Sequence, residues 1–396
     1  MSEGPLAGIR VLDLSIAVTG PYAVSLLADQ GAEVVKVERP GIGDIGRYIG
    51  VAVNGMSSLF LVCNRGKRSI AVDLQNAEGV AIVRRLAADA DVVVENFRPG
   101  VMDRLGLGYA AVAEENPAVV YASLSGFGSE GPYRDRSAYD TVMQAYAGFA
   151  ANQADPDDNV PQFLRQTAAD KVTSLYASQA ITAALFARER GRGGQHLELS
   201  MADAATSFLW IDSASNEVLI ESDNTQHSSF VAGFRPFQFL DGWGIVTPTS
   251  DHDFAGMCKA LGVEGFDDPR VATIGERIKH RDLMDSIMDM VYAHAANMTM
   301  AEATERFTAE RVPFAMILSP DELTRDPHAV AIGLFEDADH HVVGATRMPR
   351  HPTRFHATPA QLTGDSPTIG QHTDEVLAEL GLGEQIADLR AANVVA

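Results

Sequence analysis

The sequence predicts a doubly wound α/β domain followed by a smaller α+β domain. Short apolar runs alternate with helix-periodic segments through residue 124, which is the pattern of repeated β-α-β units. The runs are apolar throughout and do not alternate with polar residues, as expected for parallel strands covered on both faces. A polar stretch at 221–229 then separates this region from a shorter one with a different order of elements.

The first β-α-β unit sets the pattern. Residues 9–14 (IRVLDL) form a predicted strand, Pro21 opens a helix that stops before Gly31, and residues 32–38 (AEVVKVE) form the next strand. The remaining predicted strands of this region are 69–73, 91–95, 119–124 and 195–199. Its remaining predicted helices are 77–88, 101–105, 139–149, a helix within 164–190 that Asp170 opens, and 201–220.

The region from about 230 to 330 has a predicted hairpin at 237–246, around Asp241 and Gly242, then three helices and a strand at 313–318. The tail has strand-like pieces in the His- and Pro-rich stretch 340–359 and two short helices near 375–380 and 385–391.

Composition excludes several classes of protein. The net charge of -22 argues against nucleic acid as a partner, because binding to phosphate backbones depends on Lys and Arg. Two cysteines, Cys63 and Cys258, cannot form a disulfide framework. No apolar run approaches the length of a membrane span, and the chain opens without a secretory signal. We therefore expect a cytoplasmic protein with no membrane partner.

The charge is unevenly distributed along the chain. Residues 1–140 carry 13 Lys and Arg against 17 Asp and Glu, a net charge of -4, which leaves -18 for the remaining 256 residues. A small anionic ligand would meet the least repulsion in this first third. The cations near its predicted strand ends are Arg39, Lys67, Arg68, Arg98 and Arg104, although ordinary surface cations would give the same pattern.

Three motifs of other chemistries lack the context or the spacing that their function requires. Residues 41–46 (GIGDIG) match G-x-G-x-x-G but follow the second strand and open no helix, so we interpret them as a loop with chance glycines and not as a dinucleotide site. Ser129 in LSGFGSEG is out of register for a nucleophile elbow. Histidines 340, 341, 351 and 356 lack a ligand spacing, so a solvated hairpin is favoured and no metal is predicted.

Asp170 is the candidate for chemistry. It lies in the first turn of an otherwise small and apolar helix, where unpaired amides and the helix dipole favour an ionised carboxylate, and an ionised carboxylate can act as a nucleophile. Thr167 followed by Asp170 also resembles a capping box, in which the same carboxylate would only cap the helix. Position alone favours the cap and does not decide between the two.

Eight segments in order resemble the family III CoA-transferases of the CaiB/BaiF type, whose superfamily includes α-methylacyl-CoA racemases. They are GIRVLDLS with GPYA, LLADQGAEVVKVERPGIGD, NRGKRSIAVDL, DVVVENFRPGVMDRLGLGY, YASLSGFGSEGPY, the Asp170 segment, GQHLELSMADA and GQHTDEVLAELGL. Together they cover nearly the whole chain.

The resemblance implies an organisation and a set of site residues. It implies a Rossmann-like large domain at 1–225, a small domain at 226–330, a segment at 331–396 that returns to the large domain, and an interlocked homodimer. Coenzyme A enters as part of the substrate, with no tightly bound cofactor. The residues that match the family's CoA contacts are Arg39, Leu74, Asn96, Phe97, Arg98 and Arg104, and the residue that matches its catalytic aspartate is Asp170.

The resemblance also implies a mechanism. Asp170 would attack an acyl-CoA thioester to form an aspartyl anhydride, the CoA thiolate would then form an aspartyl-CoA thioester, and an acceptor carboxylate would reverse the steps. The first alternative is a 2-methylacyl-CoA racemase. It is disfavoured because Tyr139 stands where that branch has histidine and Gln238 where it appears to have glutamate. A noncatalytic CoA-binding protein is the second alternative.

The resemblance also has implications for the substrate. Tyr139, Asp140 and Gln238 are assigned to the substrate pocket. Tyr139 and Asp140 are expected to line the acyl pocket or to orient Asp170, although Tyr139 could equally be a packing residue. HSSFVAGFRPF, at 227–237, replaces the glycine-rich loop of some formate- and oxalate-using members. A larger acyl group is therefore expected.

Overall fold

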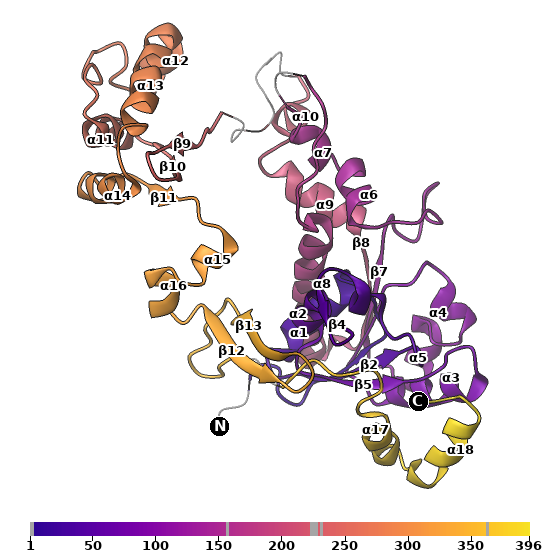
Figure 1. The fold of residues 1–396 in the computed structure, drawn as a ribbon. Helices are drawn as coiled ribbons and strands as arrows, with labels where there is room; N and C mark the ends of the chain where they lie inside the picture. Colours follow the sequence, from indigo (N-terminus) through magenta and orange to yellow (C-terminus); the bar gives the residue numbers. More distant parts are fainter. Residues whose placement is uncertain (1–3, 156–157, 222–228, 230–232, 362–363) are drawn as a thin grey trace. The chain divides into compact units, whose positions relative to one another are not determined.

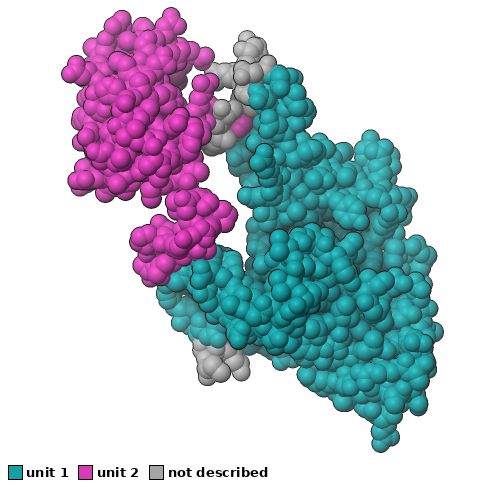
Figure 2. Space-filling model, in the orientation of Figure 1, with its two compact units in different colours: residues 1–228, 333–396 teal, residues 229–332 magenta. Residues whose placement is uncertain are grey.

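The computed structural model describes residues 4–155, 158–221, 229, 233–361 and 364–396. The chain forms two compact units (Figure 2): unit 1 contains Met1–Ser228 and Gly333–Ala396, and unit 2 contains Ser229–Ile332. The sequence places the corresponding boundaries after residues 225 and 330. Unit 1 is thus built from two segments that are far apart in the sequence.

A six-stranded, all-parallel sheet forms the centre of unit 1. Its order is β5 (Lys67–Ala71), β2 (Glu33–Glu38), β1 (Arg10–Asp13), β6 (Val92–Glu95), β7 (Val120–Ser125) and β8 (Gln195–Ser200). The chain moves outward from β1 to β5, then returns to β6 and moves outward in the other direction. The winding therefore reverses between β1 and β6, and ligands of such sheets bind at the carboxyl ends of the two strands where it reverses.

Helices cover both faces of this sheet (Figure 1). In β1, Val11 belongs to the core with α1 (Thr19–Ala28) and α8 (Ala168–Ala187), whereas Leu12 belongs to the core with α3 (Ala77–Ala88) and α5 (Tyr109–Glu115). Adjacent residues of one strand are thus buried on opposite faces, which explains why the strands are continuous apolar runs. The predicted fold class is confirmed.

The C-terminal segment packs on the same sheet. The helices α17 (Thr373–Glu379) and α18 (Ile386–Ala391) contribute Val376, Leu377 and Leu389 to the core of the α3 face. The last residue donates its amide to the carbonyl of Ala71 at the end of β5. A hairpin of β12 (Phe335–His340) and β13 (Gly344–Pro349) precedes these helices. The return of the tail to the large unit is confirmed.

Further short elements of unit 1 connect or flank these layers. They are η1 (Ile45–Tyr48), β3 (Ala52–Val53), β4 (Met56–Ser57), α2 (Ser58–Asn64), α4 (Val101–Arg104), α6 (Asp140–Tyr146), α7 (Phe149–Asn152), η2 (Arg188–Arg192), α9 (Met201–Trp210), α10 (Ser215–Val218) and η3 (Gly383–Gln385). The single helix predicted at 201–220 is wrong, because it breaks between Trp210 and Ser215 into α9 and α10.

Unit 2 has its own sheet and core. Strands β9 (Phe237–Gln238), β10 (Trp243–Val246) and β11 (Phe314–Met316) are antiparallel, so the predicted hairpin is confirmed. The helices are α11 (Asp251–Leu261), α12 (Ile274–Lys279), α13 (Arg281–Ala295), α14 (Met300–Ala309), α15 (Pro320–Leu323) and α16 (Pro327–Ala331). Among all helices of the described residues, none combines the length and apolarity that a membrane crossing requires.

Candidate active site

Asp170 lines a cavity of about 370 Å³ at the reversal point of the sheet. The loop after β1 contributes Ile16 and Ala17 to its wall, the first residue of α1 contributes Thr19, and the loop after β6 contributes residues 96–99. The carboxylate therefore lies where the topology of the sheet places a ligand site.

The first residues of two helices hold Asp170. The hydroxyl of Thr19, which opens α1, donates to Oδ1 of Asp170 at 2.5 Å. The backbone amide of Asp170 donates to Oδ1 of Asp140, which opens α6, at 3.1 Å. Asp170 itself lies in the first turn of α8, and its carboxylate contacts the first residue of α1. Helix N-termini favour negative charge.

The capping-box interpretation of Asp170 is wrong. The N-cap residue of α8 is Thr167, and its side chain makes no capping hydrogen bond. The Asp170 carboxylate instead accepts from Thr19, which lies 151 residues earlier in the chain. No hydrogen bond from any described residue reaches Oδ2 of Asp170.

Further hydrogen bonds hold Asp140 and Thr19, which contact Asp170. Gln144 donates through Nε2 to Oδ2 of Asp140 at 2.6 Å and accepts at Oε1 from the amide of Leu164 at 3.0 Å. Ser174 donates to the carbonyl of Thr19 at 2.7 Å, which ties α8 to α1. Asp140, Gln144, Thr19 and Ser174 are all buried. The Gln144–Asp140 and Ser174–Thr19 bonds are buried at both ends, so they hold the residues that contact Asp170 in place.

Burial raises the pKa of Asp170 to about 6; the Thr19 hydrogen bond lowers the pKa, and the charge of Asp140 raises it. The carboxylate is therefore ionised near neutral pH and more basic than an ordinary aspartate. A shifted pKa in a cavity marks a functional candidate, because nucleophilicity rises with basicity.

A second network fixes the loop after β1. Nδ2 of Asn96 donates to the carbonyl of Ile16 at 2.8 Å, and Oδ1 of Asn96 accepts from the backbone amide of Ile16 at 2.9 Å. Asp44 accepts the backbone amide of Ala17 at 2.7 Å, and Ala17 has a φ of 65°, which is strained for a residue with a Cβ. Asn96 lines the cavity as predicted for a CoA contact, but its amide is occupied by this loop.

Buried ion pairs below the loop anchor the same network. Lys36, on β2, contacts Oδ2 of Asp44 at 2.8 Å and the carbonyl of Ser15 at 2.8 Å. Lys67 contacts Asp13 at 2.7 Å, and Arg47 contacts Glu38 at 2.6 Å. Three cations thus face the three carboxylates of Asp13, Glu38 and Asp44, all of them buried. The neighbouring carboxylates raise the pKa of Lys36 despite its burial.

A larger, mainly apolar cavity of about 540 Å³ adjoins the Asp170 cavity and shares Ile16, Ile45 and Phe97 with it. Of the predicted CoA contacts, Arg39, Leu74 and Phe97 line the larger cavity, and Asn96, Phe97 and Arg98 line the Asp170 cavity. Arg104, on α4, is exposed and lines neither of the two. Five of the six residues thus surround two adjacent cavities.

The loop at 41–46 also lines the larger cavity. Its glycines are not a chance feature, because Gly41 and Gly43 have φ values of 75° and 71°. A Cβ at Gly43 would lie 2.8 Å from Oε2 of Glu38. The loop needs these glycines for its backbone conformation, so that part of the interpretation was wrong.

Charge distinguishes the Asp170 cavity from a third cavity of about 390 Å³. Around Asp170 the other charged residues of the wall are Arg98, Arg134 and Arg136. The third cavity has five carboxylates in its wall, from Glu95, Asp103, Glu130, Glu198 and Asp203, and its basic residues are Arg98 and His196. An anionic ligand is therefore attracted to the Asp170 cavity and repelled from the third one.

Tyr139 and Gln238 lie in different units. Tyr139 is exposed and lines the Asp170 cavity next to Asp140. Gln238 lies on β9 of unit 2, where its side chain is exposed. The segment at 227–237 that motivated the expected acyl size lies partly outside the described residues.

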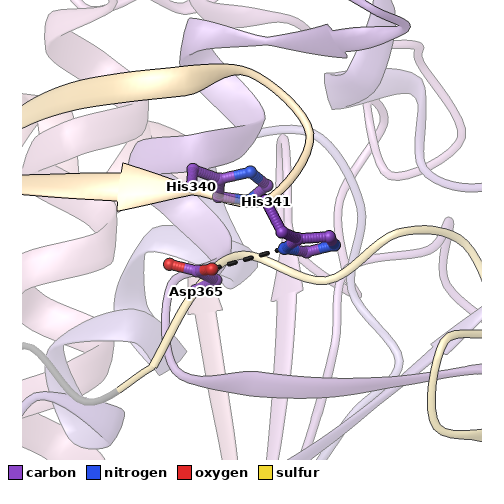
Figure 3. Close-up of side chains that lie close together, drawn as sticks. All are labelled: His340, His341 and Asp365. Carbon is purple, nitrogen blue, oxygen red and sulfur yellow. Dashed lines mark hydrogen bonds and ion pairs between the residues drawn. The ribbon is translucent and has the colours of Figure 1, made fainter.

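His340, His341 and Asp365 lie close together (Figure 3). Among the described residues they are the only group of three or more His, Cys, Asp or Glu side chains close enough to hold a metal ion. His340 is buried, so the expectation of a solvated hairpin is wrong for this residue. Its Nε2 bonds the carbonyl of Ser366 at 2.9 Å and its Nδ1 accepts the amide of Val342 at 3.1 Å. With both ring nitrogens engaged, His340 has no free position for a metal. The group ties the β12–β13 hairpin to the following segment.

Thr19, Ser174 and Gln144 were not singled out from the sequence. Thr19 could have been found by the rule that places ligands at the loop after the first strand of a doubly wound sheet. Gln144 and Ser174 carry no such signal, because their partners come from distant segments.

Known proteins resemble this chain over most of its length. The family described as CoA-transferase family III matches residues 6–373. A succinate–glutarate CoA-transferase from Agrobacterium fabrum is 34% identical, with 97% of each chain covered. A succinyl-CoA:glutarate CoA-transferase from Homo sapiens is 31% identical and covers 99% of this chain and 90% of its own. The crystal structure of a CaiB/BaiF family protein from Brucella suis aligns with a TM-score of 0.81 and 31% identity, covering 96% of this chain and 100% of that one.

Proposed function

The chain belongs to CoA-transferase family III and is a CoA-transferase, and on that premise we propose that Asp170 is the nucleophile that carries the transfer. The observation that supports this most strongly is that its carboxylate is held in one orientation, has one oxygen without a hydrogen bond from the described residues, and has a raised pKa. Thr19 and the backbone contact to Asp140 orient the carboxylate, Oδ2 is the oxygen in question, and the pKa is near 6.

The proposed reaction has four steps. Oδ2 of Asp170 attacks the acyl carbon of the donor thioester, the carbon–sulfur bond breaks, and CoA leaves as a thiolate. The thiolate sulfur then attacks Cγ of Asp170, which breaks the Cγ–Oδ2 bond and releases the first acid as a carboxylate. The acceptor carboxylate attacks the resulting thioester at Cγ and expels the thiolate. The thiolate finally attacks the acceptor acyl carbon of this second anhydride, the bond between that carbon and the aspartyl oxygen breaks, and the new acyl-CoA departs, which regenerates the Asp170 carboxylate.

One thioester replaces another in this scheme, so the reaction does not need ATP. The protein has to hold the CoA thiolate near Asp170 between steps and to stabilise the oxyanions. We assign the adenosine end of CoA to the cavity of about 540 Å³ and the thiol end to the Asp170 cavity, because the two cavities are adjacent.

Replacing Arg39 with alanine is expected to raise the KM for acyl-CoA about tenfold and to leave kcat unchanged. Arg39 is exposed at the wall of the larger cavity, and no described residue pairs with its guanidinium. Its charge is therefore available to a phosphate that does not react. Steady-state kinetics measures both constants. Arg347→Ala, which removes an exposed pair with Asp337, is the matched control and should change neither. A fall in kcat with constant KM would contradict the assignment.

The acid side of the pH profile should follow Asp170. Because burial raises the pKa of its carboxyl to about 6, the reactive ionised form is lost as the pH falls through 6. We expect kcat/KM to be level above pH 7 and to fall about tenfold per unit well below pH 6. The CoA dissociation constant must be measured over the same range, since a phosphate monoester also titrates near pH ~6. A level profile between pH 5 and 7 after this correction would contradict the proposal.

The substrates are proposed to be a dicarboxylic acid and the CoA thioester of another. The names of two relatives pair glutarate with succinate or with succinyl-CoA. The three arginines of the Asp170 cavity provide positive charge for an additional carboxylate. A screen of acyl-CoA donors against mono- and dicarboxylic acids, read by mass spectrometry of the CoA products, tests this. Transfer to dicarboxylic acids should dominate, and preference for monocarboxylic acids would contradict the substrate class.

We also propose a homodimer. Large apolar side chains are exposed on neighbouring helices of unit 1, namely Leu175 and Phe186 on α8 and Phe208 and Trp210 on α9. Grouped exposed apolar residues of this size are typical of protein interfaces. Light scattering of the purified protein should give twice the chain mass, and a monomer at micromolar concentration would contradict this proposal.

A further inference from the structure

We propose that the Thr19 hydroxyl is the oxyanion donor for the steps in which Asp170 itself is attacked, an inference that rests on the proposed function. The hydroxyl bonds Oδ1 of Asp170, and the oxygen left to react with the donor thioester is Oδ2. Once Oδ2 has formed the anhydride, Oδ1 is the carbonyl oxygen of the aspartyl group. Thr19 therefore faces the oxygen on which charge develops next.

The chemistry of the second step requires a donor at this atom. When the CoA thiolate attacks Cγ, the electron pair of the Cγ–Oδ1 double bond moves onto Oδ1 and gives a tetrahedral oxyanion. Collapse of this intermediate breaks the Cγ–Oδ2 bond and restores the double bond, which leaves the aspartyl-CoA thioester. The same oxyanion forms when the acceptor carboxylate attacks that thioester. In the two other steps the charge develops on the acyl oxygen of the substrate, which Thr19 does not contact.

The structure prepares Thr19 for this role. Thr19 is 5% exposed, so its hydrogen bond is largely shielded from water. It is the first residue of α1, and its carbonyl accepts the hydroxyl of Ser174 at 2.7 Å, while Ser174 also bonds the carbonyl of Asp170 at 2.9 Å. The donor and the acceptor are thereby linked through one buried serine. A donor held in place before the reaction stabilises an oxyanion without reorganisation cost.

The test separates the two halves of the reaction. Wild type, Thr19→Val and Thr19→Ser are mixed with an acyl-CoA in the absence of acceptor and quenched with acid at increasing times. Free CoA thiol reports the anhydride, and CoA-linked protein in the intact mass spectrum reports the aspartyl-CoA thioester. Valine has nearly the shape of threonine without the hydroxyl, so thermal unfolding and CoA affinity should remain those of wild type.

We expect Thr19→Val to release CoA thiol at a rate close to that of wild type but to form CoA-linked protein about 100-fold more slowly. Thr19→Ser should restore the second rate. Formation of CoA-linked protein at the wild-type rate in Thr19→Val would overturn the role of Thr19 alone. Absence of both signals in wild type would overturn the proposed function and this inference together.

A pH profile gives a second reading that a purely structural role would not change. The Thr19 hydrogen bond lowers the pKa of Asp170, so its removal should move the acid limb of kcat/KM to higher pH, and serine should move it back. An acid limb at the same pH in all three proteins would contradict the contact between Thr19 and Asp170.

Discussion

Replacing Asp170 with asparagine is expected to reduce CoA transfer by about 10⁴-fold or more while the fold is retained. Asparagine keeps the shape of the side chain and an oxygen that accepts from Thr19, but its amide is not a nucleophile. The measurement is CoA transfer at saturating donor and acceptor, with Asp170→Ala as a second variant. Activity within tenfold of wild type in both variants would contradict covalent catalysis by Asp170.

The same variant carries its own control for folding. The pKa of Asp170 is raised in the folded protein, so the ionised form is disfavoured there and lowers stability above pH 6. This cost is absent below the unfolded pKa, near pH ~4, where the carboxyl is neutral in both states. Asp170→Asn is therefore expected to be at least as stable as wild type at pH 8. A loss of activity can then not be assigned to unfolding.

Replacing Lys36 with methionine is expected to lower the free energy of unfolding by about 3–5 kcal/mol. Lys36 is fully buried and contacts Asp44, and its loss leaves that buried carboxylate and the carbonyl of Ser15 without their partner. Asp44 also holds the amide of Ala17, so the loop that carries Thr19 should loosen. Denaturant unfolding measures the change.

An exposed ion pair provides the comparison for Lys36. Arg390 and Asp374 form a pair at 2.6 Å between two exposed side chains. Arg390→Ala should lower the free energy of unfolding by about 0–1 kcal/mol, because water screens the pair. Equal effects of Lys36→Met and Arg390→Ala would mean that the buried network does not hold the loop in place.

The sheet could be predicted from the sequence because each strand is a local apolar run between turn signals. The helix at 77–88 was predicted with its observed bounds, since Asn76 caps it and the apolar residues recur at helical spacing. Helix α2 is not predicted, because the five apolar residues of its sequence SLFLVCN are continuous and show no helical period, although Ser57 caps its first turn. The break after Trp210 was missed because the apolar pattern continues through Ile211, which is 79% exposed.

The candidate site could be located from the sequence only in part. The resemblance to the family pointed to Asp170, Asn96 and Phe97, and both the resemblance and the predicted strand ends pointed to Arg98. The partner of the Asp170 carboxylate could not be predicted, because Thr19 comes from a segment 151 residues away and the nearby Thr167 offered a plausible local alternative. Asn96 was expected to contact CoA, but its amide is used to hold the backbone of Ile16. Hydrogen bonds between residues that are distant in the sequence decide what Thr19 and Asn96 do, and a local sequence pattern does not reveal such bonds.

The most direct test of covalent transfer is the identification of the residue that carries CoA during turnover. The protein is incubated with an acyl-CoA without acceptor, treated with hydroxylamine, digested, and mapped by peptide mass spectrometry. We predict a hydroxamate at Asp170 in wild type, its absence in Asp170→Asn, and its loss when an acceptor acid is added first. Transfer that proceeds with no modification at Asp170, or with modification of another residue, would contradict this mechanism.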